Sequence, residues 1–356
     1  MTASRKVTLP LAVLALIAVG ATLHTLGTAL LPFVVAFFLA NLFRPMVQFL
    51  VRKRVPMILS ILLVVLLVGA VLFGVTIVVV SSVQSLVTAL PRYEAKWNDS
   101  LLPSILQLIQ RAPQEVQAQV KNLKWTNIVD ASAILGILSA GAGSFLTLVS
   151  GLILILLFML FILGGNGTFT LKVRKAYPDQ ADALAEMIHK IDHKVQKYMI
   201  TVSLVNLASG ALTTGILAAF GVDLALLWGL LTFLVNYIPT IGSIIAFILP
   251  VAVAFLQFDS VGTPIAVGVT LIVLQFTLGS VLTPKIMGSS LNLSPLLVLI
   301  SLFFWGWIWG PWGMILSVPI TSTIKIVLES ISGTEPIAIL MSSEGKITGK
   351  TKKGSP

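Results

Sequence analysis

The sequence predicts an all-α protein that crosses a membrane several times. Hydrophobic residues make up 57% of its 356 residues and charged residues only 10%, whereas roughly a quarter of the residues in a soluble globular protein are charged. The mean hydropathy is +1.02, and the apolar residues gather into long runs. We therefore expect a polytopic integral membrane protein with about eight transmembrane helices, or up to about ten shorter membrane segments.

The apolar runs give the order of these segments, because a helix needs about 20 apolar residues to cross the hydrocarbon core. They cover residues 1–27, 30–43, 58–83, 145–163, 199–220, 224–235, 241–258, 264–282, 293–309 and 312–328. We read the first two as a membrane hairpin rather than a cleaved signal peptide, because the second run follows at once. The runs that begin at residues 224 and 293 are short and end at Pro and Gly, so they are candidates for re-entrant hairpins.

Basic residues set the expected orientation. Lys and Arg in short loops are retained on the cytoplasmic side, and they cluster at residues 44–54, 172–197 and 346–353. We therefore predict that both termini are cytoplasmic, and we assign the net charge of +10 to cytoplasmic loops rather than to a nucleic-acid surface. The expected parts are N-terminal membrane helices (1–83), an amphipathic extracytoplasmic helical layer (84–143), a membrane helix (144–164), a cytoplasmic amphipathic helix (165–198), a C-terminal transport region (199–331) and a cytoplasmic tail (332–356).

The sequence lacks the residue patterns of common enzymes and metalloproteins. It has no cysteine, no P-loop lysine motif, no HExxH pattern and no Gly-x-Ser elbow with a base nearby. His189 and His193 lie four residues apart, as metal ligands can. Their helix is strongly polar, so we favour a solvated or partner-facing helix. We expect no catalysis, no metal and no cofactor.

Charged residues are rare between residues 199 and 331, and each is a candidate for function because a buried ion is costly in a bilayer. Asp259 lies in a turn-like link and is expected to be a solvated loop acid. Asp223 precedes an apolar run, where we favour a helix cap over a role in ion coupling. Lys325 and Glu329 are four residues apart and can pair on one helix face; a role in gating or coupling is the alternative.

Two interruptions of the apolar runs suggest a path for a solute. Residues 236–243 read Asn-Tyr-Ile-Pro-Thr-Ile-Gly-Ser, and a helix broken there frees backbone groups that can replace the hydration shell of a solute. A plain tight turn between two spans is the alternative. Residues 305–313 hold four Trp and three Gly, which fit a pore or gate lining, or else an interfacial Trp belt with close glycine packing.

At these motifs the chain resembles the autoinducer-2 exporter family of bacterial membrane transporters, and looks most like its quorum-sensing-signal branch. The matching motifs follow one another in the family's order along nearly the whole chain. They are residues 45–48 (Pro-Met-Val-Gln), 51–56 (Val-Arg-Lys-Arg-Val-Pro), 226–231 (Leu-Leu-Trp-Gly-Leu-Leu), 236–243, 284–288 (Pro-Lys-Ile-Met-Gly), 291–294 (Leu-Asn-Leu-Ser), 304–307 (Phe-Trp-Gly-Trp), 310–314 (Gly-Pro-Trp-Gly-Met), 317–319 (Ser-Val-Pro) and 325–326 (Lys-Ile).

The resemblance implies a multi-pass protein of the bacterial inner membrane that moves small polar solutes and forms a homo-oligomer. Export of autoinducer-2 is reported for the nearest branch, and sodium–proton antiport for other relatives. The chain also departs from the family pattern. Where the family often carries Asn and then Glu before the Pro-Lys motif, this chain has Ser280 and Thr283, and Arg44 replaces the usual Asn before Pro45. If that Glu coordinates a cation, its replacement speaks against antiport.

We predict a secondary transporter whose broken segments surround a polar path. The residues expected to line or shape the path are Asn236, Tyr237, Pro239, Thr240, Gly242, Ser243, Thr283, Pro284, Lys285, Gly288, Trp305, Gly306, Gly310 and Gly313. Lys285 would attract an anionic or oxygen-rich solute, while Asp223, Lys325 and Glu329 are candidates for coupling. The expected partners are the lipid bilayer and a small polar solute or ion. The alternatives are a sodium or other cation–proton antiporter and a non-transporting membrane scaffold whose outer layer binds a partner.

Overall fold

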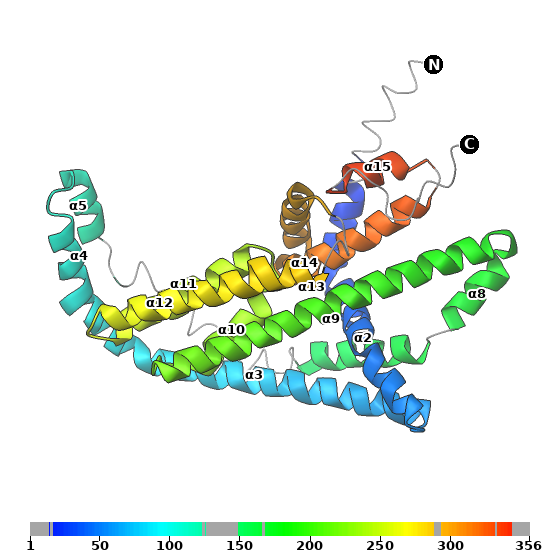
Figure 1. Cartoon of the computed structure of the whole chain (residues 1–356), viewed down its shortest axis with the longest axis horizontal. Helices are drawn as coiled ribbons and strands as arrows, with labels where there is room; N and C mark the ends of the chain where they lie inside the picture. The colour runs from blue at the N-terminus through cyan, green and yellow to red at the C-terminus, as the bar shows by residue number, and fades with distance from the viewer. Residues whose placement is uncertain are drawn as a thin grey trace, which may run out of the picture.

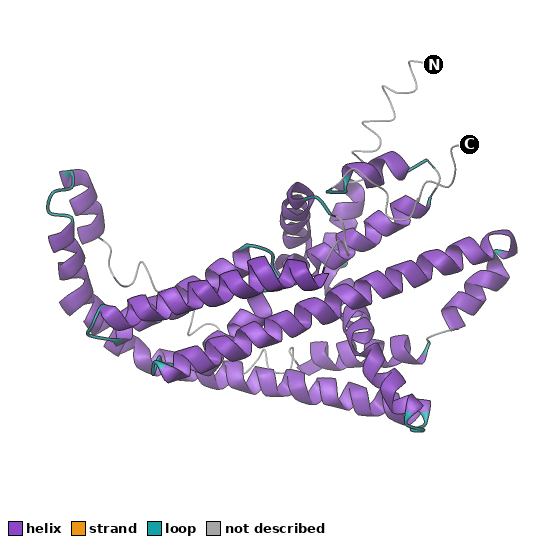
Figure 2. Cartoon of the chain, viewed as in Figure 1, coloured by secondary structure: helices purple, strands orange, loops and turns teal. Residues whose placement is uncertain are grey.

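The computed structural model describes residues 14, 17–122, 125, 149–165, 168–287, 293–331 and 333–343, and these form helices joined by short turns, without a β-strand (Figure 2). Five of the described helices are long and apolar enough to cross a membrane, and three apolar helices are shorter. Large apolar side chains such as Leu66, Phe161 and Phe303 are exposed, which marks a surface that faces lipid. The predicted class, a polytopic all-α membrane protein, is confirmed.

The elements follow the order of the apolar runs (Figure 1). The first part contains α2 (Gly27–Arg52), α3 (Met57–Lys96), a π-helix (Trp97–Leu101), α4 (Leu102–Leu108), α5 (Gln114–Lys121) and an apolar helix at Val149–Gly164. The second part contains α8 (Thr168–Ala176), a 3₁₀ turn (Pro178–Gln180), α9 (Ala181–Ala219), α10 (Ala225–Val235), α11 (Ile241–Gln257), α12 (Gly262–Gln275), a π-helix (Phe276–Leu282), α13 (Thr283–Met287), α14 (Pro295–Ser330) and α15 (Glu335–Leu340).

Some expected features lie outside the described residues. They are most of the first segment of the N-terminal hairpin, residues 126–148 of the expected outer layer, Gly288, and the end of the tail from residue 344. The N-terminal hairpin, the full extent of the outer layer and the role of Gly288 therefore stay predictions.

α3 and α9 are long, continuous helices. α3 has 40 residues and is therefore about 60 Å long, twice the roughly 30 Å of a hydrocarbon core. It passes through residue 83, where we expected the membrane part to end, and α4 and α5 turn away from its far end (Figure 1). α9 has 39 residues and likewise passes through residue 198. The two expected boundaries fall inside helices, and the domain division and its sidedness stay predictions.

α9 is the helix on which the other elements pack. One buried cluster joins it to α2 and α14 and includes Phe38, Met199 and Leu316. A second joins its C-terminal end to α3 and to the segment from α10 to α12, and includes Leu217 and Val267. In Figure 1 the C-terminal part of α9 (green) is drawn between α12 and α3, and along its length α9 contacts α2, α10, α12 and α14. Elements that are distant in the sequence therefore meet along α9.

α10 and α11 form a helical hairpin that turns at residues 236–240. α10 has only 11 residues, or about 16 Å, which is too short to cross the roughly 30 Å core. Pro239 and Thr240 form the turn, and Thr240 has a φ of 65°. Gly242 then returns so close to α10 that a Cβ atom there would lie 1.9 Å from the carbonyl oxygen of Val235. Only glycine fits at this position, so Gly242 sets how tightly the hairpin closes.

α14 is a second hairpin. Trp309 and Gly310 leave the helical conformation, and Gly310 has a φ of 62°. Nε1 of Trp305 donates to Oγ1 of Thr321 at 3.2 Å, although sixteen residues of straight helix would separate them by about 24 Å. The chain therefore turns back at the predicted interruption. A Cβ atom on Gly313 would lie 1.8 Å from the carbonyl oxygen of Trp305, the same close approach as in the first hairpin.

Candidate solute path

α9 and α10 approach each other closely through small residues. A Cβ atom on Gly210 would lie 2.6 Å from the carbonyl oxygen of Gly229, and one on Gly229 would lie 1.8 Å from Oγ1 of Thr214. In a membrane, small residues let helix backbones pack against one another where no hydrophobic effect drives the association. The close approach also brings the polar side chains of the two helices together.

Seven of the polar residues along this interface form a line that we call the polar row. They are Ser203, Asn206, Ser209 and Thr213 of α9, Thr232 of α10, and Asn236 and Tyr237 at the hairpin turn. The α9 members are three or four residues apart, so they share one helix face. Nδ2 of Asn236 donates to Oγ of Ser209 at 3.1 Å, and the hydroxyl of Tyr237 donates to Oγ of Ser203 at 2.7 Å. These bonds anchor the turn of the first hairpin on α9.

Four members of the polar row are buried, Ser203, Asn236 and Tyr237 are half-buried, and the row is only partly hydrogen-bonded. Asn206 is 5% exposed, and Thr213 and Thr232 are 0% exposed. Among the described residues, the atoms of the row that are buried without a hydrogen-bond partner are Asn206 Nδ2, Thr213 Oγ1, Thr232 Oγ1 and Asn236 Oδ1. Leaving such a group unpaired costs about 1–3 kcal/mol, so stability does not explain a row of them. Their donors and acceptors can instead bind a small polar solute.

Sequence reasoning found only two members of the polar row, Asn236 and Tyr237. The others are Ser, Thr and Asn residues inside apolar runs, where they usually bond to the backbone of their own helix. A usable signal was present, because the α9 members recur at helical spacing around Gly210. Without the partner helix, that spacing does not tell a buried face from an exposed one.

The predicted residues of the Trp-Gly motif form the turn of α14. Trp305 is buried and its ring centroid lies 5.3 Å from that of Trp309. A Cβ atom on Gly306 would lie 2.9 Å from the side chain of Met314. These residues pack the two arms of α14 together, and the described ring contacts and hydrogen bond of Trp305 are with residues of its own hairpin, Thr321 included. The role of the motif as a gate stays a prediction.

Both hairpins reach the same part of α9. Tyr237 from the first hairpin and Leu316 from the second pack on one cluster that contains Tyr198, Met199 and Val202. The two interrupted segments, which are far apart in the sequence, therefore meet beside the end of the polar row.

Other predicted path residues lie apart from the polar row or make only local bonds. Oγ1 of Thr283 donates to the carbonyl oxygen of Leu278 at 2.7 Å, at the end of a π-helix. Lys285 is exposed, and Pro284 lies beside it in α13. Ser243 is also exposed, and its hydroxyl donates to the carbonyl oxygen of Thr240 in the turn at 2.9 Å. The π-helix is notable because such segments are frequent at functional sites.

The carboxylate of Asp223 is bound to α3 rather than to α10, although the backbone carbonyl of Asp223 accepts a hydrogen bond from Nε1 of Trp228 in α10 at 3.0 Å. Its carboxylate accepts hydrogen bonds from the guanidinium of Arg92 and, at 2.9 Å, from the hydroxyl of Tyr93. Its backbone N–H donates to Oε1 of Gln257 at 2.7 Å. Leu224, with a φ of 60°, stands at the start of α10, which has no side-chain cap. The interpretation of Asp223 as a helix cap is therefore wrong, because two donors from α3 hold the carboxylate instead.

A second contact joins α3 to the link between α11 and α12. The ammonium group of Lys96 donates to the carboxylate of Asp259, which is exposed in this link as expected. That hydrogen bond and the charge of Lys96 lower the pKa of Asp259 below its ordinary value. The far end of α3 is thus held to two loops of the C-terminal region by charged pairs.

Lys325 and Glu329 form the predicted pair on α14. Nζ of Lys325 lies 3.3 Å from a carboxylate oxygen of Glu329, and the side chains are 2% and 8% exposed. Lys194 of α9 is near enough to interact electrostatically with both. Residue 194 and the end of α9 at residue 219 are about 38 Å apart along the helix. The pair and Asp223 therefore lie toward opposite ends of α9, with the polar row between them.

Long apolar helices with lipid-facing side chains, together with two hairpins that pack beside α9, define a polytopic α-helical membrane protein. The chain belongs to the family described as AI-2E family transporter, whose model matches residues 11–333. The resemblance seen in the motifs is thereby confirmed.

Three relatives illustrate the match. The chain is 32% identical over 341 residues to the AI-2 transport protein TqsA of Escherichia coli strain K12, covering 96% of each chain. It is 30% identical over 334 residues to a putative transport protein of Haemophilus influenzae, covering 93% of this chain and 95% of the relative. It is 26% identical over 310 residues to the putative transport protein YrrI of Bacillus subtilis, covering 85% and 86%.

Proposed function

We propose that the chain exports a small polar solute across the bacterial inner membrane, with the autoinducer-2 signal as the candidate substrate. The observation that carries this proposal is the set of buried, unpaired polar atoms along the polar row. The name of the Escherichia coli relative, an AI-2 transport protein, supports the choice of substrate. An oxygen-rich solute would find there the hydrogen bonds that it loses when it leaves water.

The proposed path runs along the interface of α9 and α10. From residue 203 to residue 213 the row covers about 15 Å of α9, half of a hydrocarbon core of roughly 30 Å. The hairpin turns at residues 236–240 and 309–310 would complete the path, and movement of the hairpins against α9 would expose it to one side at a time. Lys285 would attract the solute at an entrance, and Trp305 with Gly310 and Gly313 would shape the gate.

The test removes hydroxyl groups that make no hydrogen bond. Thr213→Val and Thr232→Val keep nearly the same side-chain volume, so the folded protein should be as stable as the parent. Each should reduce efflux of labelled autoinducer-2 from proteoliposomes about tenfold, which corresponds to one lost hydrogen bond to the solute. Thr270→Val is the control, because this hydroxyl is exposed and bonds only to the carbonyl of Ala266 in its own helix.

Equal efflux from the Thr213→Val protein and the control would place the path elsewhere. A lower melting temperature in the Thr213→Val protein, with proportionate loss of efflux, would mean that the hydroxyl is structural.

Cation–proton antiport is the second candidate, and the buried Lys325–Glu329 pair favours it. A titratable acid inside the protein is what proton coupling requires. Under this reading an imposed pH gradient drives sodium flux into proteoliposomes, and Glu329→Gln abolishes that flux. An exporter without coupling would retain its efflux of autoinducer-2 in the same variant. Absence of both fluxes from folded protein would favour the membrane scaffold.

A further inference from the structure

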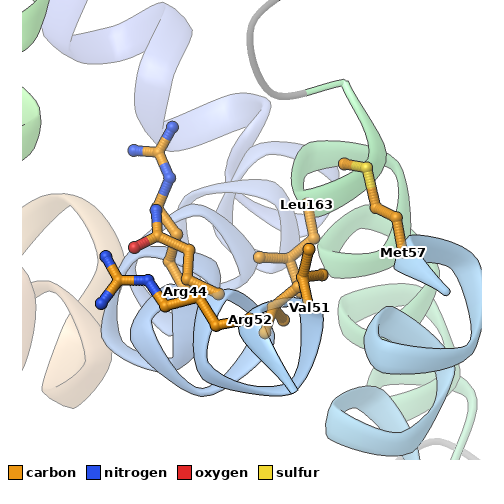
Figure 3. Close-up of a pocket in the computed structure, with 7 residues that line it drawn as sticks. Arg44, Val51, Arg52, Met57 and Leu163 are labelled. Carbon is orange, nitrogen blue, oxygen red and sulfur yellow. The ribbon is translucent and has the colours of Figure 1, made fainter. Parts of the chain in front are cut away.

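A pocket at the end of α2 contains cationic side chains that the proposed solute path does not use. It has a volume of about 410 Å³ and lies where α2 ends, α3 begins and the helix Val149–Gly164 comes close (Figure 3). None of these three helices contributes a residue to the polar row. The pocket is therefore separate from the proposed solute path.

One side of the pocket is a line of hydrogen-bond donors. Arg44, Gln48 and Arg52 line it at intervals of four residues, so they share one face of α2. The other side is apolar and includes Met57 and Leu163. In Figure 3 the side chains of Arg44 and Arg52 extend to one side, away from Met57. Two planar guanidinium groups beside an apolar wall match a ligand that is anionic at one end and apolar at the other.

The surrounding structure orients one arginine and bears on the charge of the pocket. A carboxylate oxygen of Asp192 in α9 lies 2.8 Å from NH1 of Arg44, which fixes the direction of this side chain and offsets part of its charge, so Arg52 carries more of the attraction for an anion. The chain from Asn41 to Ser60 has no acidic residue. α3 begins at Met57 without a side-chain cap and without an acid in its first turn, so the positive end of its dipole also lies at the pocket.

The position of the pocket indicates where its ligand comes from. Arg52 and the next two basic residues separate two apolar helices, so this loop must lie at the membrane surface. Beside it, the apolar side chains of Phe49 and Ile58 are 60% and 76% exposed. A ligand held by the arginines therefore has an apolar surface directly alongside it.

We propose that this pocket binds the phosphate of an anionic phospholipid, with the acyl chains along the exposed apolar faces of α2 and α3. Arg52 and Arg44 donate to the phosphate, Gln48 donates to the phosphate or glycerol oxygens, and Met57 and Leu163 contact the start of an acyl chain. Basic pockets between membrane helices are suited to lipid head groups because charge and apolar surface are offered together.

The test measures lipid binding by the purified full-length protein in detergent. Phosphatidylglycerol and, separately, phosphatidylcholine are titrated, and bound lipid is counted by native mass spectrometry. We expect phosphatidylglycerol to bind more tightly, and Arg52→Gln to weaken its binding about five- to tenfold. Arg54→Gln is the matched control, because it removes the same charge from the same loop but does not line the pocket; its affinity should stay within about twofold of the parent.

Arg52→Lys separates geometry from charge. It keeps the charge but loses the planar fork, so we expect an affinity between those of the parent and of Arg52→Gln. If Arg52→Gln and Arg54→Gln lost the same affinity for phosphatidylglycerol, the lipid would be attracted only by the general charge of the loop, and the proposal would be overturned. Displacement of the lipid by inorganic phosphate at about 10 mM, a concentration at which even weak millimolar anion sites fill, would assign the pocket to a free anion and would overturn it as well.

Discussion

Lys325 and Glu329 pair inside the protein, where each charge has lost its water. Removing one partner of such a pair leaves the other charge buried, which typically costs 3–5 kcal/mol, whereas replacing both with apolar residues is often neutral. A pair in this setting adds little to stability, so its chemistry is the better explanation for its presence. Glu329 is therefore a stronger candidate for coupling than Asp223 at the protein's other end.

We expect Glu329→Gln to lower the free energy of unfolding by about 3 kcal/mol, and the double variant Lys325→Met/Glu329→Leu to lower it by less. Unfolding in detergent, followed by circular dichroism, measures both. Glu186→Gln is the control, since Glu186 forms a pair of the same spacing with Lys190, 2.6 Å apart but exposed; its change should be under about 0.5 kcal/mol. A double variant less stable than Glu329→Gln would contradict the prediction.

The two hairpins close in the same way, although their turns differ in sequence. In each, a glycine just after the turn packs on the backbone of the preceding arm, so no side chain fits between the arms. The arms of a short hairpin can be buried in a membrane protein only where their free backbone groups find partners. Tight closure therefore keeps the two arms of each hairpin in direct backbone contact.

We expect Gly242→Ala and Gly313→Ala each to lower the free energy of unfolding by at least about 2 kcal/mol, because the added methyl must displace backbone atoms. Gly215→Ala is the matched control: it lies inside α9, four residues before the last residue of this helix, and a Cβ atom there meets nothing within 4 Å. It should raise stability by up to about 1 kcal/mol through helix propensity. Melting curves in detergent distinguish these outcomes, and three equal melting temperatures would remove the argument for tight closure.

Across the whole molecule, ion pairs between distant elements lie toward both ends of α9. At one end Arg92, Tyr93 and Lys96 of α3 hold Asp223 and Asp259. At the other, Arg44 pairs with Asp192, and Lys325 with Glu329. The excess of basic residues near the second end is the basis for placing it in the cytoplasm. The predicted orientation in the membrane therefore depends on how basic residues are distributed over the whole chain.

The absence of cysteine from the sequence makes that orientation measurable without background. We expect a membrane-impermeant maleimide to label Glu115→Cys in intact cells, because α5 is predicted to be extracytoplasmic. Lys53→Cys should be labelled only after the membrane is permeabilised, because its loop is predicted to be cytoplasmic. Both positions are exposed, so access to the reagent depends on the side of the membrane. The reverse pattern would invert the topology, and with it the proposed direction of export.

Much of the fold was predictable because lipid imposes simple rules. A long apolar run in lipid forms a helix whose backbone groups bond to one another, so the class and the order of segments followed from composition and spacing. The two hairpin turns coincide with interruptions that combine Pro and Gly, whereas single prolines such as Pro45 and Pro250 lie inside helices. The Lys325–Glu329 pair was also predictable, since its two residues are four apart on one helix. The family followed from motifs in a fixed order, and the matched family model confirms it.

Only the tertiary structure decided the contacts between elements that are distant in the sequence. Asp223 looks like a cap in its local sequence, but Arg92 and Tyr93, more than a hundred residues earlier, hold it instead. Ser209 and Thr213 belong to an ordinary apolar run until α10 packs on them. Local spacing determines which face of a helix a side chain occupies. Which other helix packs on that face is decided by the tertiary structure. In this protein the packing of α10 on α9 decides which polar groups stay unpaired.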